Sequence, residues 1–197
     1  MMTRHRDLTP ADILPMERYD RERRDHRRRI AALKQHRRVE VGPHATFYFE
    51  NFDTMWHQVH EMLAVERGGA AQLKDELEAY NPLIPKGDEL IATVMFEIED
   101  PVQRNRALDQ LGGVEDRMYL AFGGEKIAGL ADPTRENTSP EGKASSVQFI
   151  RFPFTPAQKA KFKTPGARIE VGIEHPHYGH IAVMPEATRA ALAEDLA

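Results

Sequence analysis

Three imidazoles and one carboxylate fall within the seven residues of Glu174–His180. In an extended backbone, residues i and i+2 project to the same side, so His175 and His177 can converge on one ion. Because neutral imidazole is a common ligand of transition metals, this pair predicts metal binding. The alternative is that these histidines are surface or hydrogen-bonded turn residues, since Pro176 and Gly179 favour turns.

Two carboxylates on the helix predicted after Thr54 are the other candidate ligands. Glu66 falls within an apolar stripe, where an unpaired carboxylate is costly, so it needs a partner. Glu61 forms an i,i+4 pair with His57, and a solvated helix face is the simpler interpretation of that pair. An ion pair between Glu66 and an arginine, either Arg67 or one from the N-terminal helix, explains the pattern equally well. The stripe consists of Met55, Val59, Met62 and Leu63.

These residues together suggest a composite metal site. We expect His175 and His177 to meet Glu61 or Glu66, with His44 nearby from a Gly-Pro-His turn. Two histidines and a carboxylate suit non-haem Fe(II) and leave positions open for oxygen chemistry. The leading hypothesis is therefore a protein that binds iron or another divalent transition metal and has a redox or oxidative-stress role, as a metal-dependent oxidoreductase if it is an enzyme. The competing explanation is an arginine partner for Glu66 and backbone hydrogen bonds for the histidines.

The N-terminal segment is strongly basic. Residues 17–38 hold ten basic and four acidic residues, a local charge of +6, whereas the whole chain has a net charge of −4. An apolar seam of Tyr19, His26, Ile30 and Leu33 predicts one amphipathic helix that packs on the body or on a second copy in a homodimer. The alternative function is thus a non-enzymatic interaction module that binds an acidic or redox protein partner, or RNA, through Arg18 to Arg38. Nucleic acid is disfavoured because the chain is acidic and no stacking aromatics interleave with the arginines. The arginines concerned are Arg18, Arg21, Arg23, Arg24, Arg27, Arg28, Arg29, Arg37 and Arg38.

Apolar periodicity and turn residues predict the elements that position these side chains. Helices are predicted over residues 16–36, 54–67, 70–80, 101–111, 156–162 and 185–196, and strands over 38–41, 45–51, 90–99, 114–122, 126–131, 146–154, 168–173 and 181–184. Several strands are joined by turns of hairpin length, which favours a single α+β domain with a mainly antiparallel sheet flanked by helices. We expect a basic helical arm over residues 1–38 and an α+β body over residues 39–197, forming one structural unit.

Composition and missing motifs narrow the class further. The 197 residues include no cysteine, so thiolate metal sites, cysteine nucleophiles and disulfides are excluded. Apolar residues make up 41% of the chain, enough for a folded core. Glycine-rich nucleotide loops, the G-x-S-x-G elbow and the H-E-x-x-H helix are absent from the sequence. Without a long apolar run, no membrane association and a cytoplasmic location are expected.

Several sequence blocks are distributed along nearly the whole chain. They are Leu8-Thr9-Pro10-Ala11-Asp12-Ile13, Arg37-Arg38-Val39, Gly42-Pro43-His44, Glu61-Met62-Leu63 with Glu66-Arg67, Ala79-Tyr80-Asn81-Pro82-Leu83-Ile84-Pro85, and Glu174-His175-Pro176-His177-Tyr178. Together these blocks resemble a bacterial family catalogued as domain of unknown function 3501, and the resemblance implies no established activity. Genes of this family often lie near those of rubrerythrin-like and iron–sulfur proteins, which implies iron or peroxide-related redox physiology. His57 and His60 stand where other residues are expected in relatives, so the resemblance leaves His44, Glu61, Glu66, His175 and His177 as candidates.

Overall fold

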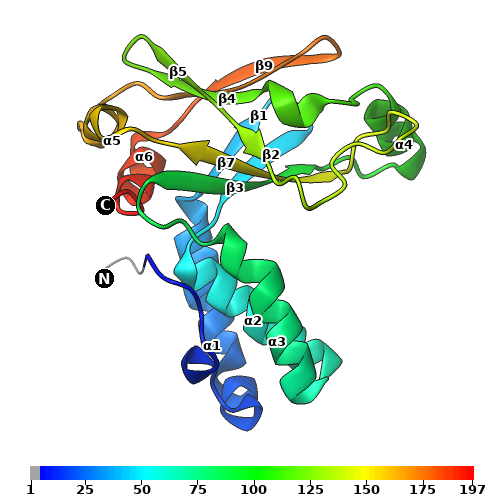
Figure 1. The fold of residues 1–197 in the computed structure, drawn as a ribbon, viewed down its shortest axis with the longest axis vertical. Coiled ribbons are helices and arrows are strands. Elements are labelled where there is room, and N and C mark those ends of the chain that lie inside the picture. Colours follow the sequence, from blue (N-terminus) through cyan, green and yellow to red (C-terminus); the bar gives the residue numbers. More distant parts are fainter. Residues whose placement is uncertain (1–4) are drawn as a thin grey trace.

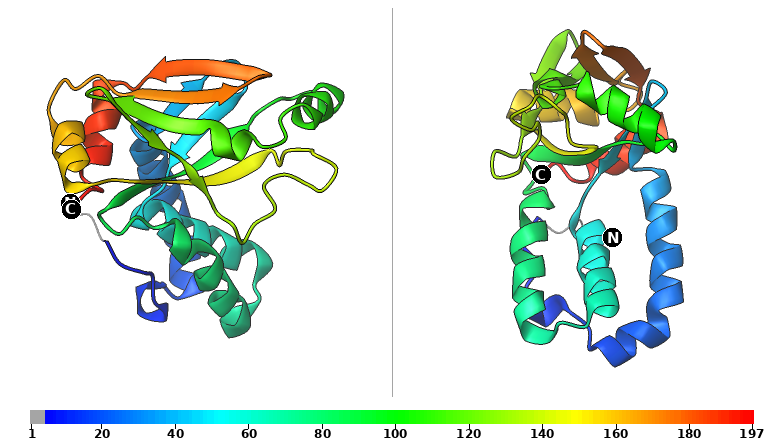
Figure 2. Two further views of the ribbon diagram at one scale, coloured as in Figure 1. Left: turned by 45° about the horizontal axis from the view of Figure 1, so that its top comes forward. Right: turned by 90° about the vertical axis from the view of Figure 1, so that its right-hand side faces the viewer.

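The arginine-rich segment forms a long helix whose apolar seam is covered by a second helix. In this computed structural model, which describes residues 5–197, α1 (Met16–Gln35) packs along α2 (Phe52–Glu66), and α2 also contacts α3 (Gly69–Tyr80). Tyr19 and Ile30 are 0% and 2% exposed, so the predicted docking of the N-terminal helix on the body is confirmed. Figure 2 shows the three helices side by side below the sheets. The first four residues of the predicted arm lie outside the described residues.

Local sequence sets where the bundle helices begin and end. α2 starts earlier than predicted because the side chain of Asn51, rather than that of Asp53 or Thr54, caps it by accepting from the Thr54 N–H. It ends where Arg67 adopts a left-handed conformation with φ 56°. Short 3-10 turns flank the bundle at η1 (Pro10–Asp12) and η2 (Asn81–Leu83).

The strands form two sheets in which every ladder between described strands is antiparallel. This confirms the predicted α+β fold with mainly antiparallel strands, but the strands form two sheets rather than the single sheet predicted (Figure 1). The first sheet has the order β1 (Arg38–Val41), β2 (Ala45–Phe49), β3 (Glu89–Phe96), β7 (Val147–Pro153) and β6 (Leu130–Ala131). The second has the order β5 (Glu125–Ala128), β4 (Met118–Phe122), β8 (Glu170–His175) and β9 (Tyr178–Val183).

A sharp corner at Gly129 carries the chain from the second sheet into the first. The predicted single strand over 126–131 is therefore divided into β5 and β6. The backbone passes so close to β7 that a Cβ at Gly129 would lie 2.5 Å from Ile150 Cγ2, which explains why glycine occupies this position. At the opposite side, β1 of the first sheet contacts β8 and β9 of the second. The two sheets are thus joined at both sides.

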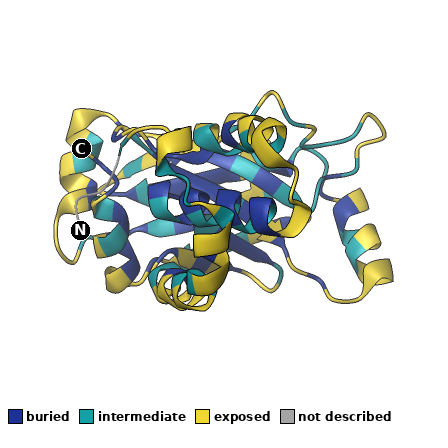
Figure 3. Cartoon of the chain, turned by 90° about the horizontal axis from the view of Figure 1, so that it is seen from below, coloured by how far each residue is buried: buried dark blue, intermediate teal, exposed yellow. Residues whose placement is uncertain are grey.

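The side chains of β3 alternate between the two faces of the first sheet, and each face lines a separate apolar core. Leu90, Ala92 and Val94 face the core between the sheets. Ile91, on the other face, belongs to a second core that the bundle forms with the first sheet, together with Phe52. Burial of both faces is the main force that fixes the bundle against the sheet, because each face removes apolar surface from water. Figure 3 shows the buried residues concentrated on the strands and the exposed residues on the outer sides of the helices.

Three further helices close the ends of the sheets: α4 (Pro101–Asp109), α5 (Pro156–Lys163) and α6 (Glu186–Ala193). Leu108, Phe162 and Leu192 bring each of them into the core between the sheets. Three further strand predictions need correction. The segment predicted over 114–122 begins with the 3-10 turn η3 (Val114–Arg117), and the strands predicted over 168–173 and 181–184 extend toward each other into a hairpin. No helix among residues 5–197 is long and apolar enough to span a membrane.

Candidate functional site

A polar network joins α1 to α2 inside the bundle. The Tyr19 hydroxyl donates to Glu61 Oε1 over 2.8 Å, and its oxygen lies 3.0 Å from His57 Nδ1. Arg23 donates from Nε and Nη2 to both oxygens of Glu61, at 2.9 Å each. The sequence suggested an ion pair between Glu66 and Arg67 or an N-terminal arginine, but the carboxylate that pairs with an arginine of α1 is Glu61. α1 therefore covers the side of α2 that was expected to be solvated.

The protonation states of this network follow from its surroundings. The hydrogen-bonded Arg23 guanidinium lowers the pKa of Glu61 to about 2. Burial lowers the pKa of His57 to about 4 and raises the pKa of Tyr19 above its usual range. At neutral pH the phenol therefore donates to the carboxylate, and neutral His57 donates from Nδ1 to the Tyr19 oxygen. Because none of these groups titrates near pH 7, the network is suited to holding two helices together rather than to exchanging protons.

A second histidine of α2 fastens the N-terminal segment to the bundle. His60 is fully buried, and its Nε2 accepts from the Leu14 N–H over 3.0 Å. Its Nδ1 lies 2.7 Å from the Trp56 carbonyl oxygen, so neutral His60 donates there. The Trp56 indole N–H in turn donates to the Asp12 carbonyl oxygen over 2.8 Å. The role of His60 in holding the N-terminal segment was not predicted from the sequence. The position of this histidine directly after Val59 of the apolar stripe could have indicated that it is buried.

The predicted metal ligand Glu66 does not lie on a buried face. It is exposed at the last residue of α2, where its Oε2 accepts from Gln72 Nε2 over 3.1 Å. The expectation of burial is wrong because the apolar stripe continues past the end of the covered surface; the preceding residue, Val65, is 69% exposed. Arg67 pairs with Asp20 of α1 instead of with Glu66.

The histidine-rich segment forms the hairpin between β8 and β9, with Pro176 and His177 in its turn. The ring centroids of His175 and His177 lie 5.9 Å apart. The His177 N–H donates to His175 Nδ1 over 3.2 Å, and His175 Nε2 lies 3.2 Å from the Gly112 carbonyl oxygen. Both nitrogens of His175 thus have backbone partners, as the turn interpretation of the sequence described.

His44 lies beside this hairpin through a tyrosine that the sequence analysis did not single out. The Tyr178 hydroxyl donates to the Val41 carbonyl oxygen over 2.7 Å and accepts from the N–H groups of His44 and Ala45, each at 2.9 Å. The His44 ring centroid is 6.3 Å from that of Tyr178. The turn between β1 and β2 is therefore held by β9. A tyrosine directly after the histidine pair, at the start of a strand, was the signal available.

The five predicted ligands fall into two separate regions. His175, His177 and His44 lie around Tyr178 in the second sheet and the turn beside it, whereas Glu61 and Glu66 lie on α2. Figure 1 shows β9 at the top of the molecule and α2 in the bundle below the sheets. Within residues 5–197, no group of three or more histidine, aspartate or glutamate side chains is arranged to hold a metal ion. The fold does not assemble these five residues as one constellation.

The outer face of α1 carries cations without partners in the described chain. Arg21, Arg24 and Arg27 are exposed, and none has a carboxylate within ion-pair distance among residues 5–197. The spacing of three residues places them on successive turns of one side of the helix. Other arginines of the segment have intramolecular roles: Arg23 binds Glu61, and buried Arg37 binds Asp195. The continuous basic surface expected from nine arginines is reduced to a smaller outward patch.

These features define an α+β domain with two antiparallel sheets and an appended helical bundle, held by buried polar contacts. The chain belongs to the family described as protein of unknown function (DUF3501), which matches residues 7–196 and confirms the resemblance found in the sequence blocks. It is similar to a crystal structure at 1.90 Å resolution of a novel protein of unknown function from Burkholderia pseudomallei K96243. That similarity covers 96% of this chain and 99% of the other, with 38% identity and a TM-score of 0.89. No curated protein matches the chain.

Proposed function

We propose that this protein is a non-enzymatic interaction module that binds an acidic protein partner through the outer face of α1. The observation that supports this is the unpaired set Arg21, Arg24 and Arg27. Like charges three residues apart destabilise a helix by a few tenths of a kcal/mol per pair, and no carboxylate among residues 5–197 lies within ion-pair distance of these three arginines. Carboxylates on a partner would offset it and would gain charge-assisted hydrogen bonds.

An acidic protein suits this surface better than RNA. Single-stranded RNA is held by aromatic side chains on which bases stack, in addition to cations. The aromatic rings nearest to the patch, those of Tyr19, His26 and Trp56, contact one another within the bundle instead. Three arginines also neutralise few phosphates, so the affinity for a polyanion of phosphates would be modest.

The non-haem iron hypothesis has less support from the geometry. A metal bound by Glu61 would have to displace Arg23 from both carboxylate oxygens, and a metal bound by His175 would have to displace a backbone partner. Breaking these contacts would leave charged or polar groups unpaired. Metal binding by His177 or His44 stays a prediction from the sequence, and elemental analysis of the purified protein tests it.

The test uses the triple variant Arg21→Glu, Arg24→Glu, Arg27→Glu and a control with the same change in net charge. The control is Arg106→Glu, Arg117→Glu, Lys163→Glu, because these three cations are also exposed and also have no carboxylate within ion-pair distance among residues 5–197. Fluorescence anisotropy measures binding to labelled poly-L-glutamate between about 50 and 300 mM salt. We expect the α1 variant to bind at least about tenfold more weakly, a change of about 1.4 kcal/mol, and the control to change less than about twofold.

Three outcomes would contradict the proposal. The first is no measurable binding of poly-L-glutamate at low salt, and the second is an equal loss in both variants. The third is tighter binding to poly(U) than to poly-L-glutamate, with a steep salt dependence, which would assign the patch to nucleic acid. Sedimentation equilibrium at the same salt concentrations shows whether the acidic partner is a second copy of this chain.

A further inference from the structure

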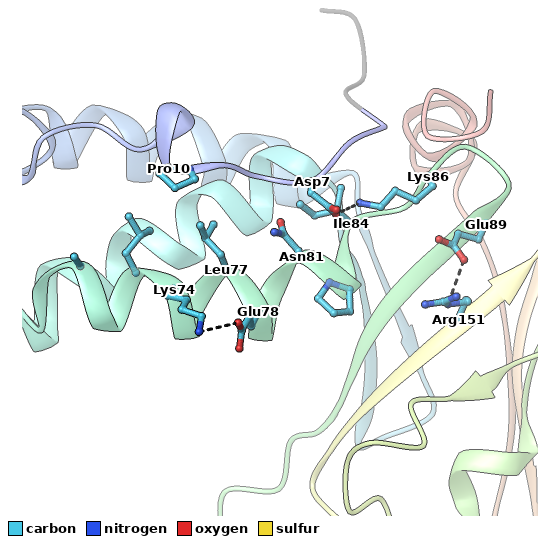
Figure 4. Close-up of a pocket in the computed structure, with 13 residues that line it drawn as sticks. Asp7, Pro10, Lys74, Leu77, Glu78, Asn81, Ile84, Lys86, Glu89 and Arg151 are labelled. Carbon is cyan, nitrogen blue, oxygen red and sulfur yellow. Dashed lines mark hydrogen bonds and ion pairs between the residues drawn. The ribbon is translucent and has the colours of Figure 1, made fainter.

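A cleft between the N-terminal segment and α3 has no role in the proposed interaction. We call residues 5–13 the strap. The strap runs past α3 to the ends of β3 and β7, and the cleft lies between the strap and α3 (Figure 4). Its volume is about 680 Å³, within the range of small-molecule sites in proteins. The cleft lies away from the patch on α1, so the two surfaces can be tested separately.

The floor of the cleft is apolar. Leu77 and Ile84 form its base and are almost fully buried, and half-buried Leu73 and exposed Pro82 supply the apolar surface that water reaches. Such a surface gains free energy when an apolar molecule replaces the water that covers it. The chemistry of the floor therefore selects an apolar ligand body.

Each cation at the rim already has an acidic partner. Lys86 lies 2.5 Å from Asp7, Arg151 lies 3.2 Å from Glu89, and Lys74 lies 3.8 Å from Glu78. Figure 4 shows these three pairs around the cleft. A charged ligand would have to compete with one of these pairs, whereas an uncharged ligand leaves them intact. The rim therefore favours a molecule without net charge.

The strap wall is held in place before any ligand binds. Asn81 accepts from the Leu8 N–H over 2.8 Å and donates from Nδ2 to the Leu8 carbonyl oxygen over 3.0 Å. The Leu8 side chain is 2% exposed, so it anchors the strap in the bundle core. A wall fixed by two hydrogen bonds and a buried side chain loses little conformational freedom on binding, which favours affinity.

The cleft continues at both ends. A cavity of about 320 Å³ shares Ala70 and Leu73 with it, and a cavity of about 530 Å³ shares Pro82 and Arg151. The first cavity and the cleft follow α3, whose 12 residues span about 18 Å at 1.5 Å per residue, and the second cavity continues past the end of α3 along β6 and β7. From the continuity of these cavities, the apolar floor and the paired rim charges, we propose that the cleft binds an elongated, uncharged, mainly apolar small molecule.

The test compares two fluorophores built on a naphthalene ring. N-phenyl-1-naphthylamine is uncharged, and 8-anilinonaphthalene-1-sulfonate carries one negative charge. Both emit more strongly in apolar sites. We expect saturable binding of the uncharged probe at one site per chain and at least tenfold weaker binding of the anionic probe. No saturable signal, or tighter binding of the anion, would overturn the proposal.

Blocking variants locate the site. Ala70 lines the cleft and is exposed, so Ala70→Trp narrows it without a change in the core, and Ala71→Trp is the matched control on the next, exposed residue. Lys74→Trp blocks the middle of the cleft independently. We expect each blocking variant to weaken binding of the uncharged probe at least tenfold and the control to leave it unchanged, with circular dichroism melts confirming folding. Equal affinities of the blocking variants and the control for the uncharged probe would show that the probe does not bind in this cleft.

Discussion

Two buried tyrosines hold different parts of this molecule together, and they do so with different partners. The Tyr178 hydroxyl binds only backbone groups, those of Val41, His44 and Ala45. The Tyr19 hydroxyl contacts only side chains, those of Glu61 and His57. Backbone partners cannot move without moving the strands, whereas side chains can rotate or reach water. Tyr178 therefore fixes the backbone of the strands around it. The contact that Tyr19 makes in the bundle depends instead on the charge of Glu61 and the protonation state of His57.

The largest expected effect comes from Tyr178→Phe. Loss of this hydroxyl removes one hydrogen-bond partner from two N–H groups and one carbonyl of the partly buried turn between β1 and β2, and each unsatisfied buried group costs about 1–3 kcal/mol. We expect the free energy of unfolding in urea to fall by about 3 kcal/mol. Tyr19→Phe is the comparison and should cost about 1 kcal/mol, because Arg23 still binds Glu61. Equal costs for the two variants would show that the nature of the partners is unimportant.

Lowering the pH should weaken the bundle more than the sheets. The pKa values of folded His57 and His60 are about 4, below the ordinary value of 6.5. The unfolded chain therefore takes up protons between pH 6.5 and 4 that the folded chain does not, so their stabilising contribution is present above pH 6.5 and is lost as the pH falls toward 4. Allowing for partial exposure of His57, we expect the unfolding free energy to drop by about 2 kcal/mol from pH 7 to pH 5.

Two histidine variants isolate this effect. His57→Gln should reduce the drop in unfolding free energy by about 1 kcal/mol, since one of the two buried imidazoles is removed. His177→Gln, in the exposed turn of the hairpin, should leave the drop unchanged. Urea titrations at pH 7, 6 and 5 supply the measurement. A drop that His57→Gln does not alter would mean that other groups carry the pH dependence.

The smallest effect concerns the two carboxylates that the sequence placed together. Glu61→Gln removes the ion pair with Arg23, whose side chain is 35% exposed while that of Glu61 is 20% exposed. Solvent screens such a pair, so we expect a loss of about 1 kcal/mol in unfolding free energy. Glu66→Gln, on the exposed end of the same helix, should change it by less than about 0.5 kcal/mol. Similar losses in both variants would contradict the different environments of these residues.

The sequence predicted the elements better than it predicted the partners of their side chains. The alternation of Leu90, Ala92 and Val94 and the seam through Tyr19 and Ile30 identified real buried faces, because periodicity depends only on local geometry. The same reasoning failed for Glu66, since the apolar stripe does not reveal where the covering helix ends.

Tertiary partners were harder to predict because they depend on which helices become neighbours. The pairing of Arg23 with Glu61 spans 38 residues, and no local pattern selects it over the other arginines of α1. The convergence of His175 and His177 on an ion was inferred for an extended backbone, whereas Pro176 and His177 form the turn between β8 and β9. That inference also did not include the hydrogen bond between His175 and the Gly112 carbonyl oxygen, because Gly112 lies 63 residues away in the chain.

The joining of the two sheets at both sides has a consequence for how this protein meets other chains. β1 lies along β8 and β9, and the edge strand β5 contacts β7 and runs through Gly129 into β6, which has only two residues. Exposed strand edges are the usual templates on which another chain adds a strand and on which fibrils grow. Since β1 lies against β8 and β9 and β6 has only two residues, the first sheet offers little edge of that kind among the described residues, and we expect it to resist strand addition.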